Sequence, residues 1–178
     1  APLAHPSEYS TSVVGRERTF QYYSREHGTP GAIGRLVYSI DPRYGVMQEV
    51  ASWVLQGTPV PLGTGSVNVM WQGDVNAQFL RLLNHCETPA MPINVGGPEI
   101  VSVRYLAKRF GEIFDVEPIF DGDEEELCPI VNCDRIAGRL GNPVVAIDPM
   151  IAWVAEWVKS GKPILGKPCK FQVRSGKF

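Results

Sequence analysis

Tyr9 begins the string Tyr-Ser-Thr-Ser-Val-Val-Gly-Arg-Glu, residues 9–17, whose spacing is typical of a proton-transfer site on a helix. A tyrosine followed four residues later by a lysine places a phenol and an ammonium on one helical face. The ammonium lowers the pKa of such a phenol, which then transfers a proton near neutral pH. Val13 holds the lysine position here. We therefore expect Tyr9 to act as a proton donor, or as a hydrogen-bond donor to a carbonyl oxygen.

A helix is predicted to carry Tyr9. Ser7 or Ser10 is a suitable N-cap, and the helix should end near residue 27, before the turn residues 28–31. Residues 32–38 then have the pattern of a short strand. The apolar side chains predicted to form the buried side of the helix are Val13, Val14, Phe20 and Tyr23.

Helices and strands alternate along the rest of the chain, which predicts an α/β architecture. Apolar spacing and capping residues predict helices over residues 45–56, from Asp74 to about residue 83, after Ser102, over residues 133–140 and from Asp148 onward. Short strands are predicted over residues 67–71, 93–95 and 116–120.

The composition limits the classes of function. A chain of 178 residues, 44% apolar and with a net charge of -2, is expected to form one domain with a substantial core. The small net charge gives no indication of a nucleic-acid or membrane partner, and no apolar run reaches the ~18 residues of a membrane helix. Four scattered cysteines predict reduced thiols in the cytoplasm. Three isolated histidines without ligand spacing predict no metal site.

Two segments concentrate charge of one sign. Residues 121–126 hold five acids, which are expected to form a solvated loop, with a metal site as the alternative. Residues 159–178 hold six basic residues and no acid, which indicates a solvated tail or an arm that binds an anion or a partner.

The string around Tyr9 resembles the motif of the extended short-chain dehydrogenase/reductase superfamily (the NAD-dependent epimerase/dehydratase family), usually Tyr-x-x-Ser-Lys-x-x-x-Glu. Tyr9, Ser12 and Glu17 match this motif, and Val13 does not. Weaker similarities follow in the family's order over nearly the whole chain, at residues 35–38, 69–74, 94–96 and 139–143.

The resemblance implies an α/β fold that is the C-terminal part of an extended Rossmann-type, NAD(P)-binding fold with a small mixed α/β substrate-binding lobe. Residues 1–40 would form the edge of the Rossmann sheet and carry the Tyr9 helix. Residues 41–160 would form mostly the substrate-binding lobe, and residues 161–178 a basic C-terminal tail. We expect the nucleotide-binding half of the protein, an N-terminal Rossmann half, to lie in sequence outside this chain.

The resemblance also implies roles for individual residues. Tyr9 and Ser12 would be catalytic, Tyr38 would contact both the cofactor and the substrate, and Arg35 and Arg43 would contact the substrate. The cofactor would be NAD or NADP, bound mainly by the missing half. In the family the helix of the catalytic tyrosine is often a dimer contact, so a homodimer is a further expectation.

The substrate is expected to differ from that of the sugar-nucleotide enzymes in this family. Those enzymes usually place one arginine on the strand before the Val-x-Asp turn and another in a later Arg-x-Gly-Asp segment, to hold the diphosphate. Val67 and Asn68 occupy the first region here, and residues 120–123 contain no arginine. Losing charge-assisted contacts of about 1.5–3 kcal/mol each favours a small keto or hydroxy compound, or an unmodified sugar.

The glycines at positions 28, 31 and 34 are not expected to form the cofactor loop. A dinucleotide needs its glycine-rich turn between a strand and the helix that follows it, so that the pyrophosphate meets the helix N-terminus. These glycines follow a predicted helix and precede a predicted strand.

Three hypotheses about function remain open from the sequence. The first is an NAD(P)-dependent oxidoreductase of the epimerase/dehydratase type, for which this chain holds the substrate. The second is a catalytically silent relative that binds a ligand or partner, which the uncharged Val13 favours. The third is an independent binding domain with its own closed core.

Overall fold

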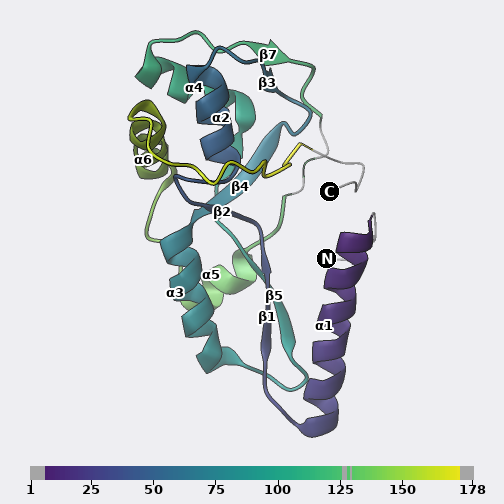
Figure 1. Cartoon of the computed structure of the whole chain (residues 1–178). Coiled ribbons are helices and arrows are strands. Elements are labelled where there is room, and N and C mark those ends of the chain that lie inside the picture. Colours follow the sequence, from purple (N-terminus) through teal and green to yellow (C-terminus); the bar gives the residue numbers. More distant parts are fainter. Residues whose placement is uncertain (1–6, 126–127, 129, 173–178) are drawn as a thin grey trace.

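The computed structural model describes residues 7–125, 128 and 130–172. Helices and strands alternate as expected for an α/β protein (Figure 1). The helices are α1 (Glu8–His27), α2 (Val46–Leu55), α3 (Gln72–Leu82), the 3₁₀ turn η1 (Leu83–His85), α4 (Val103–Phe114), α5 (Asp134–Leu140) and α6 (Ile147–Lys159). The strands are β1 (Ala32–Leu36), β2 (Tyr38–Ile40), β3 (Val60–Pro61), β4 (Ser66–Trp71), β5 (Met91–Val95), β6 (Ile100–Ser102) and β7 (Phe120–Asp121).

The strands form three small sheets. β1 pairs in parallel with β5, β3 pairs in parallel with β7, and β4 lies between parallel β2 and antiparallel β6. The predicted strand over residues 32–38 is in fact two strands, because the chain leaves the β5 pairing at Val37 and joins β4 from Tyr38 onward. The predicted strand over residues 116–120 is also wrong in extent, since only Phe120 and Asp121 pair with a neighbour.

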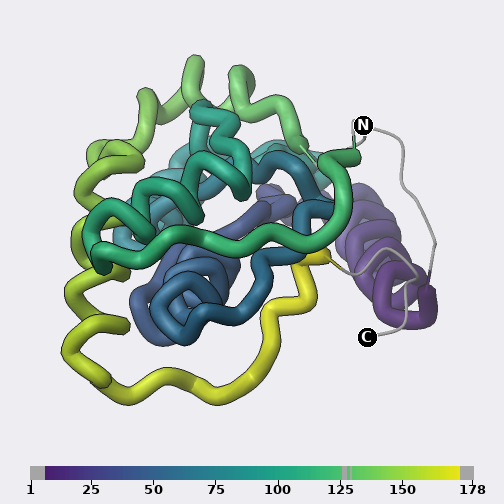
Figure 2. The backbone as a smooth tube through the Cα atoms, turned by 90° about the horizontal axis from the view of Figure 1, so that it is seen from above, coloured from purple at the N-terminus to yellow at the C-terminus, as the bar shows by residue number. Residues whose placement is uncertain are grey.

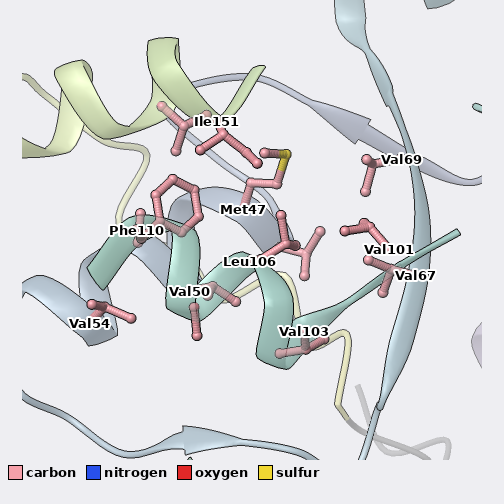
Figure 3. Close-up of a cluster of buried hydrophobic side chains, with 14 of the residues drawn as sticks. Met47, Val50, Val54, Val67, Val69, Val101, Val103, Leu106, Phe110 and Ile151 are labelled. Atoms are coloured by element: carbon pink, nitrogen blue, oxygen red, sulfur yellow. The ribbon is translucent and has the colours of Figure 1, made fainter. Parts of the chain in front are cut away.

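The main core joins α2, α4 and α6 to β4 and β6 (Figure 3). Met47 and Val50 of α2 face Leu106 and Phe110 of α4, and all four side chains are fully buried. This packing follows from the helical spacing of apolar residues, which gives each helix one apolar face. A second cluster of buried side chains lies between α3, β5 and α5, around Ile93.

Capping explains where the helices begin. Ser7 caps α1 in a reciprocal arrangement with Ser10, and the hydroxyl of Ser102 accepts a hydrogen bond from the amide of Tyr105 in α4. Asp74 and Asp148 were expected to be N-caps, but both lie inside the first turn of their helices. A carboxylate is favourable there because it meets the positive end of the helix dipole, and that of Asp74 also accepts the amide of Val145 at 2.9 Å.

The long helix α1 is only lightly buried. Its buried residues are Val14, Glu17 and Ser24. The expectation that Phe20 and Tyr23 face the core is therefore wrong, since their side chains are 62% and 55% exposed. The helix stands beside the β1–β5 pair at the edge of the molecule, as Figure 1 shows.

Residues 161–172, which we call the C-terminal strap, cross the surface and return to the core (Figure 2). The strap is fixed to the turn before α2 by a hydrogen bond from the amide of Leu165 to the carbonyl of Arg43, at 3.0 Å. Phe171 is buried against Trp53, and its carbonyl accepts a hydrogen bond from the buried hydroxyl of Thr64 at 3.0 Å. The end of the strap, residues 169–172, is thus packed, whereas residues 161–168 are exposed, as expected for a solvated tail. Residues 173–178 lie outside the described residues.

Candidate functional site

An open pocket of about 610 Å³ lies where the start of α1 approaches the turn before α2 and the C-terminal strap. We call it the Tyr9 pocket. It brings together segments that are far apart in the sequence, including the switch between β1 and β2. Its lining residues are Tyr9, Leu36, Val37, Tyr38, Ser39, Asp41, Tyr44, Gly45, Val46, Gln72, Val131 and Cys169.

Two of the predicted site residues, Tyr9 and Tyr38, line this pocket together. Tyr9 lies in the first turn of α1 with 66% of its surface exposed, so its side chain is accessible to a ligand. Tyr38 begins β2 and is half-buried. Ser12 does not line the pocket, and its hydroxyl donates a hydrogen bond to the backbone carbonyl of Tyr9 at 2.7 Å. Its predicted catalytic role therefore requires this hydroxyl to exchange partners when a ligand binds.

Arg35 lies on the other side of Tyr9, in a second open pocket of about 440 Å³. Its guanidinium donates two hydrogen bonds to the carboxylate of Glu17, at 2.9 and 2.5 Å. Hydrogen bonding to this carboxylate raises the pKa of Arg35 further above its usual value. Glu17, which belongs to the sequence motif, thus links α1 to β1. It also neutralises the charge of Arg35, the residue predicted to contact a substrate.

Arg43 is paired in a similar way. Its side chain and backbone donate three hydrogen bonds to Asp41, at 2.8 to 2.9 Å, and these bonds lower the pKa of Asp41. Arg104 pairs with Glu124 at 2.8 Å and lies over the ring of Phe120. Each of these arginines has a carboxylate partner, so an anionic ligand would have to compete with that partner.

The strand region where the family usually carries an arginine is closed to ligands. Val67 is fully buried in the main core. The side-chain amide of Asn68 is also buried and donates hydrogen bonds to the carbonyls of Gly97 and Val131, at 3.1 and 3.2 Å. These residues hold β4 against its neighbours and offer no contact to a diphosphate.

Tyr44 is a pocket residue that the sequence analysis missed. It precedes Gly45, the N-cap of α2, whose φ of +113° is a backbone conformation that glycine adopts readily. Burial, together with the nearby carboxylate of Glu49, raises the pKa of the Tyr44 phenol. No motif marks this tyrosine, and it faces the pocket only because the strap and α1 converge on its turn.

Cys169 of the C-terminal strap closes one side of the pocket. Its amide and its thiol donate hydrogen bonds to the two carboxylate oxygens of Glu49, at 2.5 and 3.0 Å. Burial and the bond to Glu49 raise the pKa of the thiol to about 12, so it stays protonated at neutral pH.

The glycines at positions 28, 31 and 34 have structural roles. Gly28 is the left-handed C-cap of α1, Gly31 pairs with Glu87, and a Cβ on Gly34 would meet the ring of Phe79 at 2.3 Å. Within the described ranges, no group of three metal-binding side chains occurs and no helix is long and apolar enough to cross a membrane. Residues 121–125 of the acidic run are exposed, and Glu126 lies outside the described residues.

Comparison with known proteins identifies the fold. No family model and no curated protein sequence matches the chain. Solved structures do match. A UDP-glucose 4-epimerase from Thermotoga maritima, solved with UDP-glucose, has a TM-score of 0.70 and 18% identity over 86% of this chain and 53% of its own. A UDP-glucuronic acid 4-epimerase from Bacillus cereus, in complex with UDP-glucuronic acid and NAD, has a TM-score of 0.72 and 16% identity over 90% and 54%. A dTDP-glucose 4,6-dehydratase from Bacillus anthracis, in complex with NAD, has a TM-score of 0.71 and 16% identity over 89% and 54%.

The chain therefore has the fold of about half of an NAD-dependent epimerase or dehydratase chain, as the sequence resemblance predicted. It spans about half the length of these solved structures. Identities of this size establish a shared fold, and a fold is compatible with more than one activity.

Proposed function

We propose that this chain is the substrate-holding part of an NAD(P)-dependent oxidoreductase of the epimerase/dehydratase type. The observation that carries the proposal is the Tyr9 pocket, in which Tyr9 and Tyr38 lie together in a chain that has this fold. Tyr9 would donate a proton or a hydrogen bond to a substrate oxygen, and Tyr38 would line the side that faces the cofactor and substrate. Residues 41–160 would form most of the substrate-binding lobe.

The cofactor would be NAD or NADP, since the UDP-glucuronic acid 4-epimerase and the dTDP-glucose 4,6-dehydratase named above were both solved with NAD. A bound nicotinamide would supply the hydride chemistry. Within the part of the chain that the structure describes, no glycine-rich turn leads from a strand into a helix that could hold its pyrophosphate. We assign that role to an N-terminal Rossmann half outside this chain.

The edge of the β1–β5 sheet supports such a second half. Among the described strands, β1 pairs only with β5. An open, mostly apolar groove of about 390 Å³ lies between α1 and the start of β1, and Phe20 and Tyr23 line it. Open strand edges and apolar grooves are usually covered in natural proteins. The exposed aromatic side chains of α1 fit a contact with the Rossmann half, or with a second copy in a homodimer.

The cysteines of the described structure are free thiols, which is consistent with a protein of the reducing cytoplasm.

The proposal is tested with Tyr9→Phe in the natural protein that contains this chain. Turnover of a panel of ketones and sugars with NAD(H) or NADP(H) is expected to fall about 100-fold, while cofactor affinity stays the same. Tyr22→Phe is the matched control, because Tyr22 is an exposed tyrosine of the same helix outside the pockets described above. Unchanged turnover in Tyr9→Phe would contradict the proposal.

Val13 favours a second candidate, a catalytically silent relative that binds a ligand or partner. It lies one helical turn from Tyr9 and supplies no charge to the phenol. Saturable ligand binding without any cofactor-dependent turnover would support this candidate over the enzyme.

A further inference from the structure

Tyr44 is a third tyrosine of the Tyr9 pocket, beside Tyr9 and Tyr38, and neither the sequence motif nor the structural neighbours assign it a role. It lies in the turn between β2 and α2, where its amide donates a hydrogen bond to the carbonyl of Asp41 at 3.1 Å. The left-handed backbone of Gly45 follows it directly. The turn therefore fixes the backbone of Tyr44 on both sides, and its side chain is held at the pocket wall.

Three segments of the chain meet around this phenol. Tyr9 lines the same pocket from the first turn of α1. The C-terminal strap places the ammonium of Lys167 over the Tyr44 ring, 4.8 Å from its centroid. Cys169, bound to Glu49, completes the wall. These contacts leave Tyr44 half-buried in a pocket that also contains the exposed Tyr9.

The surroundings favour Tyr44 as a hydrogen-bond donor. Burial and the nearby carboxylate of Glu49 disfavour the ionised form of the phenol, so the hydroxyl keeps its proton at neutral pH. A phenol of this kind donates to a carbonyl or hydroxyl oxygen, and it stabilises negative charge that develops on that oxygen.

The polar groups of the pocket indicate what kind of molecule fits. Besides the tyrosines, Ser39 and Gln72 offer neutral donors and acceptors, and Asp41 offers a carboxylate. The described lining residues include no lysine or arginine; Lys167, whose ammonium lies over the Tyr44 ring, is not among them. The nearest arginine along the turn, Arg43, is bound by Asp41. This set suits an uncharged compound with carbonyl and hydroxyl groups better than a nucleotide diphosphate.

We propose that Tyr44 contacts the substrate directly and donates a hydrogen bond to an oxygen of an uncharged carbonyl or hydroxyl compound that Tyr9 also contacts. The inference rests on the proposed function, because it requires the Tyr9 pocket to be the substrate site. It adds a specificity-determining residue to that site and separates its ligand from the sugar nucleotides of the structural neighbours.

The test uses NMR of the natural protein that contains this chain, labelled at the ζ carbon of tyrosine. The signals of Tyr9, Tyr44 and Tyr105 are assigned by their loss in the single Tyr→Phe variants. The protein is then titrated with cyclohexanone, D-galactose and UDP, and each dissociation constant is measured. Tyr105 is the control, since it lies on the exposed side of α4 away from the pocket.

We expect cyclohexanone or D-galactose to shift the Tyr9 and Tyr44 signals with one common dissociation constant, and UDP to shift neither. Tyr44→Phe should weaken that binding about 3- to 10-fold, the range for one neutral hydrogen bond. It keeps the ring under Lys167, so its melting temperature should match that of Tyr105→Phe. A shift of Tyr9 without Tyr44, an unchanged affinity in Tyr44→Phe, or tighter binding of UDP than of the uncharged probes would overturn the inference and leave the proposed function standing. If no probe moves either signal, the Tyr9 pocket is not the ligand site and both proposals fail.

Discussion

Phe171→Ala is expected to detach the C-terminal strap from the core. Phe171 is 4% exposed and lies 6.0 Å from Trp53, centroid to centroid. A buried phenylalanine covers about 150–250 Å² of apolar surface, which at about 25 cal/mol per Å² corresponds to about 4–6 kcal/mol. Measured truncations of this kind cost about 3–5 kcal/mol. A domain of ordinary stability has only about 5–15 kcal/mol in total, so the loss should be large.

The detached strap should also expose the thiol of Cys169. Burial of the thiol and its hydrogen bond to the carboxylate of Glu49 keep its pKa at about 12, against a usual value near 9. Return to the usual value would raise the thiolate fraction at neutral pH about a thousandfold, and the thiolate is the form that reacts. A thiol reagent should therefore label one more cysteine rapidly in Phe171→Ala, and this additional reaction should disappear when Cys169→Ser is combined with it.

Urea unfolding followed by tryptophan fluorescence measures the stability change, and a colorimetric thiol reagent measures the exposure. Leu165→Ala is the matched control on the same strap, because this side chain is 54% exposed and its amide bond to Arg43 is kept. It should change the free energy of unfolding by less than about 0.5 kcal/mol. The reasoning is refuted if Phe171→Ala costs less than about 1 kcal/mol, or if it leaves the labelling rate of Cys169 unchanged.

Two further predictions concern charged groups. Glu17→Gln removes the carboxylate that pairs with the partly buried Arg35. It should lower the free energy of unfolding by about 1.5–3 kcal/mol in urea titrations. Glu112→Gln, which changes an exposed ion pair, is the control and should leave the urea midpoint unchanged. Cys169 has a folded pKa raised from near 9 to about 12, so its contribution to stability is complete below pH 9 and is lost as the pH rises toward 12. The full shift would correspond to about 4 kcal/mol, and solvent access to the thiol reduces this to about 1–2 kcal/mol. Between pH 8 and pH 11 the free energy of unfolding should therefore fall less in Cys169→Ser than in the unmodified protein. An equal fall in both proteins would contradict this prediction.

The sequence predicted the fold well where local patterns decide it. The caps at Ser7 and Ser102 and the apolar spacing of α2 and α4 depend on residues a few positions apart, so they are visible without the structure. Predictions failed where a distant partner decides. Phe20 of α1 has an apolar side chain, but no described element covers it. The strand predicted after α1 is divided in two because its first part pairs with β5 and its second part pairs with β4.

The candidate site was predictable only in part. Tyr9 belongs to a motif with fixed spacing, and Tyr38 follows it at the position that the resemblance implies. The carboxylate partners of Arg35 and Arg43 were not predicted, although Asp41 is only two residues from Arg43. Tyr44 and Cys169 meet across more than a hundred residues, and only the path of the strap brings them to one pocket.

The course of the strap has a consequence for biosynthesis. The pocket combines a side chain from the first turn of α1 with Cys169, which hydrogen-bonds to Glu49 and lies two residues before the buried Phe171. During translation, domains fold as their residues emerge, beginning from the N-terminal side. The Tyr9 pocket can therefore be completed only after residue 171 has left the ribosomal exit tunnel. A nascent chain interrupted before that point would contain all the described helices of this chain and still lack the Cys169 side of the Tyr9 pocket.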